Sequence, residues 1–327
     1  METKRPTVDA AEEILGGYFP VLDHGFVSLV DYMGSDGDVE RAARVSYGYG
    51  TRKVSRTRGL IRYLRRHRHT TPFEMVELKF HCAMPIFVAR QWIRHRTANV
   101  NEYSGRYSLM PLLFYSPEPD AFALQSKANR QGRRAGPADP SLYRQAAERW
   151  RRIREAAAEG YGWMVANDVA RELARIDLPL STYTQWYWKI DLHNLFHFLS
   201  LRVDPHAQHE IRAYAEVMAG MVKRVAPLAF EAWADYELAG THLSRGELQA
   251  LASLLDVDDD RIAPRDDAEP LSQERLKEFG LSPRETREML AKLRPARPPD
   301  FELDLSTMRS PEDVAAEMQE AVPDIDR

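Results

Sequence analysis

Residues 94–108, with the sequence RHRTANVNEYSGRYS, concentrate side chains that can bind a small polar ligand. Arg94, Arg96 and Arg106 are permanent cations whose forked donors match phosphate groups or the carbonyl edge of a base. Glu102 adds acceptors only, and Ser104 adds a small hydroxyl. The stretch directly follows the apolar segment PIFVARQWI, so it forms a loop anchored by a buried helix, which favours a site for a ligand with phosphate and pyrimidine edges.

The same composition has a simpler explanation. Arginines near the C-terminus of a helix complement its dipole, and polar residues fill loops. Taken alone, the stretch leaves both interpretations open. Ser104 resembles a nucleophile at first sight, but a serine needs a neighbouring base in order to attack, and the sequence identifies none. We therefore interpret Ser104 as a ligand contact.

Other residue types capable of chemistry give weaker signals. Cys82 is the single cysteine, and in the alternating segment VELKFHC it falls on the apolar face of a strand, which favours a buried, inert thiol. His193 and His197 are four residues apart on a predicted helix, but no H-E-x-x-H motif and no cysteine accompany them. His206 and His209 raise the same question, and we expect no metal at either pair.

The usual nucleotide-binding loops are missing from the sequence. In YGYGTRK, Gly48 and Gly50 are followed by Lys53 where the third glycine of a G-x-G-x-x-G motif would stand. There is also no P-loop. The familiar signals for dinucleotide and nucleoside triphosphate sites are therefore absent from the sequence.

The elements that must position these residues are a few strands among many helices. Periodicity and composition predict strands over residues 24–34, 76–82 and 181–190. Helices are predicted over residues 38–47, 57–67, 85–96, 140–160, 167–176, 191–202 and 204–238. Asp191 is expected to cap one of them, and Pro227 to kink the last. The pattern predicts an α+β or mixed α/β fold.

Charge and proline content divide the chain near Gly240. Residues 241–327 carry 21 acidic and 12 basic residues and eight of the twenty prolines. Residues 1–240 carry 33 basic and 28 acidic residues, which suits anionic ligands. We therefore predict a catalytic domain over residues 1–240 and an acidic, proline-rich extension over 241–327 that is loosely helical or partly disordered.

Composition also bears on location and partners. No apolar run approaches the roughly 18 residues that a membrane span needs, and the N-terminus lacks the apolar core of a secretory signal. We expect a cytoplasmic protein that does not bind membranes. Residues 52–68 hold eight Arg or Lys and no acid, which could form a nucleic-acid surface. The overall pI near 6.2 instead favours a solvated helix beside a site for anionic ligands, without a nucleic-acid partner.

Residues 94–107 closely resemble the signature of the flavin-dependent thymidylate synthases, R-H-R-x-x-S-x-N-E-x-S-x-R-Y. The one departure is Asn99, where serine is usual and where an amide can still form hydrogen bonds. The matching residues are Arg94, His95, Arg96, Asn101, Glu102, Ser104, Arg106 and Tyr107. Segments similar to the family follow in order over about residues 20–237, namely RAARVSY, HTTPFE, PIFVARQWIRHR, ARIDLPLSTYT and LRVDPHAQHEI.

This resemblance implies the reductive methylation of dUMP to dTMP. In the family, 5,10-methylenetetrahydrofolate supplies the carbon, NADPH the reducing equivalents, and FAD relays them. The family's fold has a small antiparallel or mixed sheet flanked by long helices, and the active enzyme is a homotetramer whose sites are shared between subunits. FAD is held between subunits, which accounts for the missing G-x-G-x-x-G motif.

The resemblance also assigns roles to residues of this chain. Arg202 is implied to be catalytic and to act on the uracil ring, where a permanent cation stabilises negative charge on the carbonyl side. The implied dUMP contacts are Gln91, Trp92, Ile93, Arg94, Glu102, Tyr103, Ser104, Gly105, Arg106, Arg175 and Arg202. The implied FAD contacts are Thr71, Arg94, His95, Arg96, Glu102, Asp191, Leu192, His193 and His197. His69 is implied to lie on the folate side.

Two alternatives predict different behaviour. A non-catalytic RNA- or nucleotide-binding protein would be colourless and would bind RNA with a steep dependence on salt. A flavoprotein of the same fold with another methyl-transfer activity would bind FAD but would not convert dUMP to dTMP.

Overall fold

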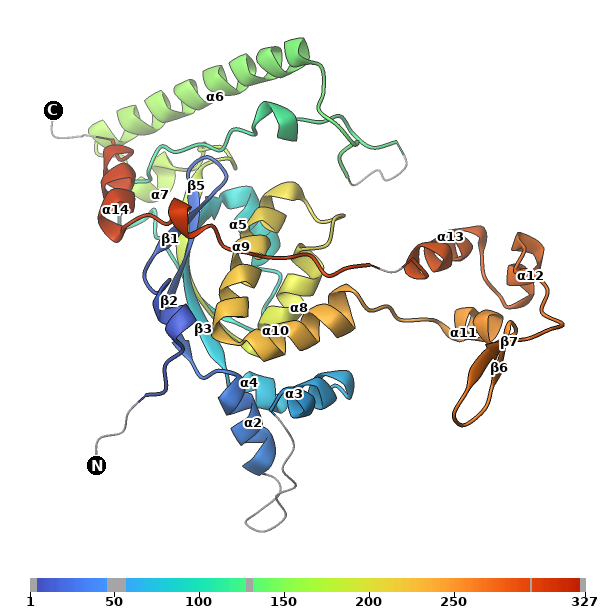
Figure 1. The fold of residues 1–327 in the computed structure, drawn as a ribbon. Helices are drawn as coiled ribbons and strands as arrows, with labels where there is room; N and C mark the ends of the chain where they lie inside the picture. Colours follow the sequence, from blue (N-terminus) through green and yellow to red (C-terminus); the bar gives the residue numbers. More distant parts are fainter. Residues whose placement is uncertain (1–4, 46–56, 128–131, 295, 324–327) are drawn as a thin grey trace. The chain divides into compact units, whose positions relative to one another are not determined.

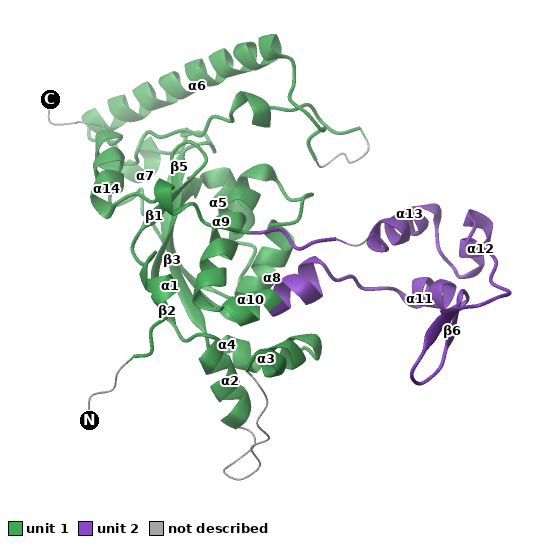
Figure 2. Ribbon diagram, in the orientation of Figure 1, with its two compact units in different colours: residues 1–231, 301–327 green, residues 232–300 purple. Residues whose placement is uncertain are grey.

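The computed structural model describes residues 5–45, 57–127, 132–294 and 296–323 (Figure 1). Gly48, Gly50, Lys53 and the start of the basic run expected over residues 52–68 lie outside these ranges. The chain divides into two compact units (Figure 2). The larger unit comprises residues 1–231 and 301–327, and the smaller comprises residues 232–300.

A five-stranded antiparallel sheet lies at the centre of the larger unit, with the order β1-β2-β3-β5-β4. Its strands are β1 (Tyr18–Val21), β2 (Gly25–Met33), β3 (Glu77–Pro85), β4 (Asn99–Glu102) and β5 (Tyr183–Asp191). The three central strands lie where the sequence predicts them, and the α+β expectation is confirmed. The two edge strands were not predicted, and β4 replaces part of the expected polar loop.

One face of the sheet is the main core of this unit. Alternate residues of β3 and β5, including Phe80, Cys82, Trp186 and Trp188, are almost completely buried there. Trp92 packs against both β5 tryptophans, with ring centroids 5.5 and 5.3 Å away. Burial raises the pKa of the Cys82 thiol well above its ordinary value, so the expectation of a buried, inert cysteine is confirmed.

The opposite face of the sheet is more polar. Lys189 forms an ion pair with Glu77 across β3 and β5 at 2.9 Å. Near the end of the sheet that holds Phe26 and Ala83, Val314 of α14 (Pro311–Glu320) packs onto both residues. Residues close to the end of the numbered sequence therefore complete the larger unit.

Helices cover the core face, and α5, α8 and α9 lie side by side against it in Figure 1. The helices of the larger unit, besides α14, are α1 (Asp9–Glu12), α2 (Asp36–Val45), α3 (Thr57–Arg66), α4 (Thr71–Glu74), α5 (Ile86–Trp92), α6 (Pro140–Ala166), α7 (Arg171–Ala174), α8 (Leu192–Arg202) and α9 (His209–Val225). The helix predicted over residues 167–176 is reduced to α7. The one predicted over 204–238 is interrupted before Pro227, which cannot continue the hydrogen-bonding ladder, and resumes as α10 (Pro227–Trp233) and a π-helical turn (Ala234–Leu238). No helix in the described ranges is both long and apolar enough to span a membrane.

The smaller unit has its own core and elements. It contains α11 (Arg245–Ala252), a hairpin of β6 (Leu255–Val257) and β7 (Ile262–Pro264), α12 (Gln273–Glu278) and α13 (Pro283–Lys292). Ala250, Leu276, Leu281 and Met289 form a buried cluster. The smaller unit begins at Ala232 and ends at Asp300, and residues 301–327 belong to the larger unit. The division near Gly240 into a catalytic domain and an extension stays a prediction.

Candidate active site

The first group of predicted site residues gathers where α5 and α8 end. The Nε–H of Arg202, the last residue of α8, donates a hydrogen bond to Nε2 of His95 at 3.1 Å. The ring of His95 also contacts Phe198 edge-on, with centroids 4.9 Å apart, and lies 6.1 Å from the ring of His197. The structure therefore brings the expected catalytic arginine next to the R-H-R segment.

The protonation of His95 follows from its surroundings. Burial lowers its pKa to about 4, assisted by electrostatic interactions with Arg202 and with His197. The imidazole is therefore neutral near pH 7, and its Nε2 is an acceptor for the Arg202 Nε–H. This contact uses only the Nε–H of Arg202, so both terminal amino groups of the guanidinium can reach a ligand.

The junction of β5 and α8 holds the expected FAD contacts Asp191, Leu192 and His193. Asp191 caps α8, as predicted, by accepting hydrogen bonds from the backbone N–H and the side-chain amide of Asn194, at 2.9 and 2.7 Å. Leu192 is fully buried. The Nδ1 atom of His193 is buried and has no hydrogen-bond partner within the described ranges. A buried ring nitrogen of this kind favours a ligand that satisfies it.

A second group forms around Gly105 and Arg175. A Cβ atom on Gly105 would lie 2.7 Å from the sulfur of Met110 and 3.1 Å from Cδ of Arg175. A larger residue at position 105 would therefore push these two side chains away from the backbone. Arg106 forms an ion pair with Glu172 at 2.8 Å, which holds the same loop against α7.

Strand β4 places this loop. Residues Asn99–Glu102 pair with β5, and the backbone N–H of Tyr103 continues the pairing by donating to the carbonyl of Gln185 at 2.8 Å. Glu102 accepts a hydrogen bond from the Thr184 hydroxyl at 2.8 Å. An edge strand therefore connects the R-H-R segment to Ser104 and Gly105.

The remaining predicted residues differ in their access to solvent. Trp92 is fully buried in the core, so its side chain supports the site from beneath and does not face a ligand. Thr71, the first residue of α4, and His69, two residues before it, are exposed. The His69 ring stacks on Tyr63 at a centroid distance of 5.9 Å. Gln91 donates a hydrogen bond to Gln208. The roles assigned to these residues stay predictions.

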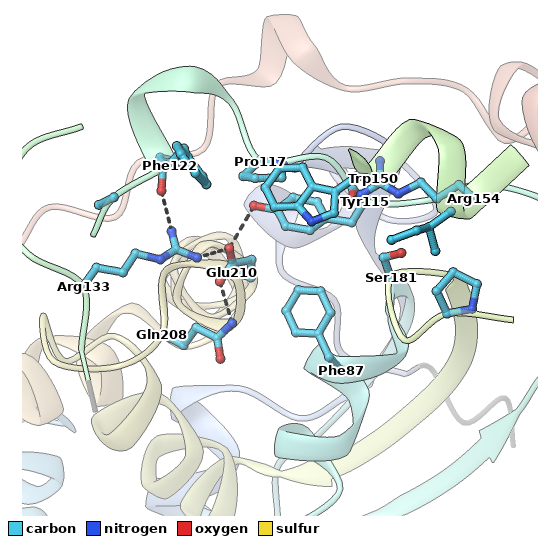
Figure 3. A pocket seen from close by; sticks show the side chains of 14 residues that line it. Phe87, Tyr115, Pro117, Phe122, Arg133, Trp150, Arg154, Ser181, Gln208 and Glu210 are labelled. Carbon is cyan, nitrogen blue, oxygen red and sulfur yellow. Dashed lines mark hydrogen bonds and ion pairs between the residues drawn. The ribbon is translucent and has the colours of Figure 1, made fainter. Parts of the chain in front are cut away.

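Gln208 leads to a cavity that the sequence analysis missed (Figure 3). Its floor is Glu210, which is 1% exposed and accepts hydrogen bonds from Gln208, Arg133 and the hydroxyl of Tyr115. The segment HAQHE contains both Gln208 and Glu210, but only its two histidines, as possible metal ligands, stand out in the sequence. Within the described ranges, no three His, Cys, Asp or Glu side chains come together as metal ligands would.

Comparison with known proteins gives consistent results. The family model described as thymidylate synthase complementing protein matches residues 28–228. A flavin-dependent thymidylate synthase of Gluconobacter oxydans (strain 621H) is 52% identical over 294 residues, covering 89% of this chain and 92% of its own, so the similarity extends past Gly240. A protein of the same name from Wolbachia pipientis wMel is 52% identical over 254 residues, covering 77% of this chain and 89% of its own.

Solved structures show the same similarity. A crystal structure of the UMP/dUMP methylase PolB from Streptomyces cacaoi, bound with 5-Br UMP, superimposes with a TM-score of 0.60. It is 35% identical and covers 68% of this chain and 99% of its own. A second structure of that methylase, bound with 5-Br dUMP, is 34% identical with the same TM-score and covers 66% of this chain and 97% of its own.

Proposed function

Because the chain belongs to the family of flavin-dependent thymidylate synthases, we propose that it is an enzyme that converts dUMP to dTMP with FAD as its cofactor. We further propose that 5,10-methylenetetrahydrofolate supplies the carbon and that NADPH supplies the reducing equivalents. The observation that carries this proposal is the hydrogen bond from Arg202 to His95, which brings an oriented cation to the R-H-R segment.

Arg202 is the proposed catalytic residue. Methylation needs the uracil ring carbon to become nucleophilic, so negative charge must build up on the carbonyl side of the ring. A fixed guanidinium stabilises that charge without exchanging protons. His95, neutral at pH 7, holds the guanidinium through one N–H and leaves the others for the ring carbonyl.

The second group suits the phosphate of dUMP. Arg106 and Arg175 supply charge, Ser104 supplies a hydroxyl, and Gly105 lets the backbone approach closely. A phosphomonoester accepts hydrogen bonds from donors of these kinds. Ser104, Gly105 and Arg106 lie on the loop that follows β4, and Arg175 directly follows α7. We propose that this group binds the anionic end of dUMP.

FAD fits the residues expected to hold it. Arg94 and Arg96 are exposed cations that can meet its phosphates, and His193 offers a buried ring nitrogen that lacks a partner in the described chain. When bound, FAD supplies the hydride chemistry that no side chain provides. The protein's own part is to bind and orient the nucleotide and to hold Arg202.

A homotetramer with shared sites agrees with the surface of the larger unit. Several large apolar side chains near the second group are exposed, including Tyr107 at 75%, Trp163 at 64% and Ile176 at 68%. Exposed apolar side chains of this size favour association with another subunit. We propose that subunits pack there and that each site takes its two groups of residues from different subunits.

The experiment that tests this function is an assay of the purified protein with dUMP, methylenetetrahydrofolate and NADPH, and dTMP measured by chromatography. We expect a yellow protein that bleaches with NADPH and forms dTMP. Arg202→Lys is expected to keep FAD and lose more than about 99% of the rate, because one donated interaction replaces a planar fork. A colourless protein, or an Arg202→Lys variant with normal turnover, would contradict the proposal. The same assay is repeated with UMP in place of dUMP. Methylation of dUMP alone is expected, whereas methylation of both nucleotides would match the UMP/dUMP activity named for the Streptomyces cacaoi protein.

A further inference from the structure

The cavity above Glu210 has the walls of a site for a flat ring. Its volume is about 350 Å³, and Phe87, Phe122 and Trp150 contribute aromatic surfaces to it (Figure 3). Phe122 and Trp150 meet edge-on with ring centroids 5.7 Å apart. A cavity of this size with aromatic walls accommodates one heteroaromatic ring system.

The floor of the cavity is polar and still has a place for a hydrogen bond. Oε1 of Glu210 accepts from the Tyr115 hydroxyl at 2.9 Å and from Arg133, whereas Oε2 accepts from Gln208 at 2.8 Å. A carboxylate has about four acceptor positions, so Oε2 can accept a further N–H. Burial alone would raise the pKa of Glu210, but Arg133 and Gln208 reverse this, and the carboxyl stays ionised.

A second cavity of about 640 Å³ adjoins the first, because Ala123, Arg133 and Gln208 line both. Three arginines give this second cavity its charge, namely Arg133, Arg134 and Arg212, and His206 and His209 also line it. None of the described residues that line it is acidic. The second cavity therefore favours a ligand segment with several negative charges.

We propose that the two cavities together bind one co-substrate that has a heteroaromatic ring with N–H donors and a polyanionic tail. The ring lies against the aromatic walls formed by Phe87, Phe122 and Trp150 with an N–H on Glu210, and the tail lies along Arg134 and Arg212. This inference rests on the proposed function, since that reaction uses two ligands of this chemistry. One is a folate with its glutamate carboxylates, and the other is NADPH with its phosphates.

The site differs from the one expected for dUMP but adjoins it. None of the residues implied to bind dUMP lines either cavity. Gln91, one of those residues, donates its side-chain hydrogen bond to Gln208, which lines both cavities. A ligand on Glu210 and Gln208 is therefore one side chain away from the nucleotide.

The test uses two variants of the full-length, FAD-loaded enzyme and one control. Arg134→Gln removes an exposed tail contact, and Phe122→Ala removes one wall of the ring site. Arg149→Gln removes an exposed arginine of α6 that lines neither cavity. KM is measured for dUMP, for NADPH and NADH, and for methylenetetrahydrofolate with one and with three glutamates.

We expect both variants to raise KM for one co-substrate by at least about fivefold, with KM for dUMP, bound FAD and the control unchanged. If the ligand is a folate, the rise in KM for methylenetetrahydrofolate caused by Arg134→Gln is larger with three glutamates than with one. If the ligand is NADPH, Arg134→Gln raises KM for NADPH more than KM for NADH. Unchanged values for both co-substrates, or a change in KM for dUMP of the same size, would overturn the proposal.

A failure of the proposed function gives a different pattern. In that case the wild-type protein forms no dTMP under any of these conditions. Equilibrium dialysis of labelled NADPH and of tetrahydrofolate triglutamate against wild type and Arg134→Gln then decides the question. Weaker binding to the variant supports the site, and equal binding to both proteins rejects it.

Discussion

At the scale of single residues, the burial of His95 beside Arg202 makes the protein sensitive to acid. The folded pKa of His95 is about 4 and the ordinary value is 6.5. The unfolded chain therefore binds a proton first as the pH falls, so the stabilisation is complete above pH 6.5 and is lost between pH 6.5 and 4. We expect denaturant unfolding to show a larger loss of stability from pH 7.5 to 5 in wild type than in His95→Gln. His206→Gln, which alters a histidine whose side chain is 82% exposed, serves as the control and should follow wild type. Parallel losses in wild type and His95→Gln would contradict this assignment.

Gly105 gives a second prediction at this scale. In Gly105→Ala the new methyl group meets the flexible ends of Met110 and Arg175, so the fold can adjust at a cost of about 1 kcal/mol. The methyl group displaces the sulfur of Met110 and also crowds Cδ of Arg175. Because we propose that Arg175 binds dUMP, KM for dUMP should rise about tenfold or more. Gly162→Ala, with open space around the new atom in α6, should keep KM and gain up to about 1 kcal/mol. An unchanged KM for dUMP in Gly105→Ala would contradict the proposal that Arg175 binds the nucleotide.

The sequence predicts many of these residues but not their neighbours. The motif identifies Arg94, His95 and Arg106, because their types and spacing are specific. Nothing local indicates that Glu210 is buried, or that Arg133 crosses to meet it from far along the chain. Such a network exists only once α9 and the segment before α6 are packed together.

At the scale of elements, the cap of α8 controls the direction of His193 and His197. Asp191→Ala removes both hydrogen bonds to Asn194 and should cost about 1 kcal/mol. Bound FAD should fall with it, as measured by absorbance after desalting. Asp191→Asn keeps a capping oxygen and should retain most of the stability and the flavin. Equal flavin loss in both variants would mean that the carboxylate acts on the ligand directly and not through the helix.

The elements missed from the sequence are the edge strands. Residues Asn99–Glu102 lack the alternation of apolar side chains that indicates a strand, since all four are exposed. They form β4 because β5 offers free backbone partners at the sheet edge, which is a tertiary effect. In contrast, β3 and β5 bury one face against helices, so their alternation is visible in the sequence.

At the scale of the whole molecule, the smaller unit is an insertion into the larger one. Phe230 and Phe301, which flank it, touch with ring centroids 6.2 Å apart. We expect that replacing residues 240–299 by a short Gly-Ser linker leaves a protein that binds FAD and keeps its Tm within about 5 °C. A chain that ends after Gly240 also lacks Val314, which packs on Phe26 and Ala83. Its Tm should therefore fall by more than about 5 °C. A linker variant as unstable as the truncated one would show that the larger unit needs the insertion.

The pairing of Tyr18 with Arg309 has a consequence for synthesis in the cell. Each residue donates its backbone N–H to the carbonyl of the other, at 3.1 and 2.8 Å. Strand β1 leaves the ribosome early, but its outer partner is translated only after the entire insertion. The nascent protein therefore carries an unfinished sheet edge through most of translation, and a chaperone that shields exposed strands would act during this interval.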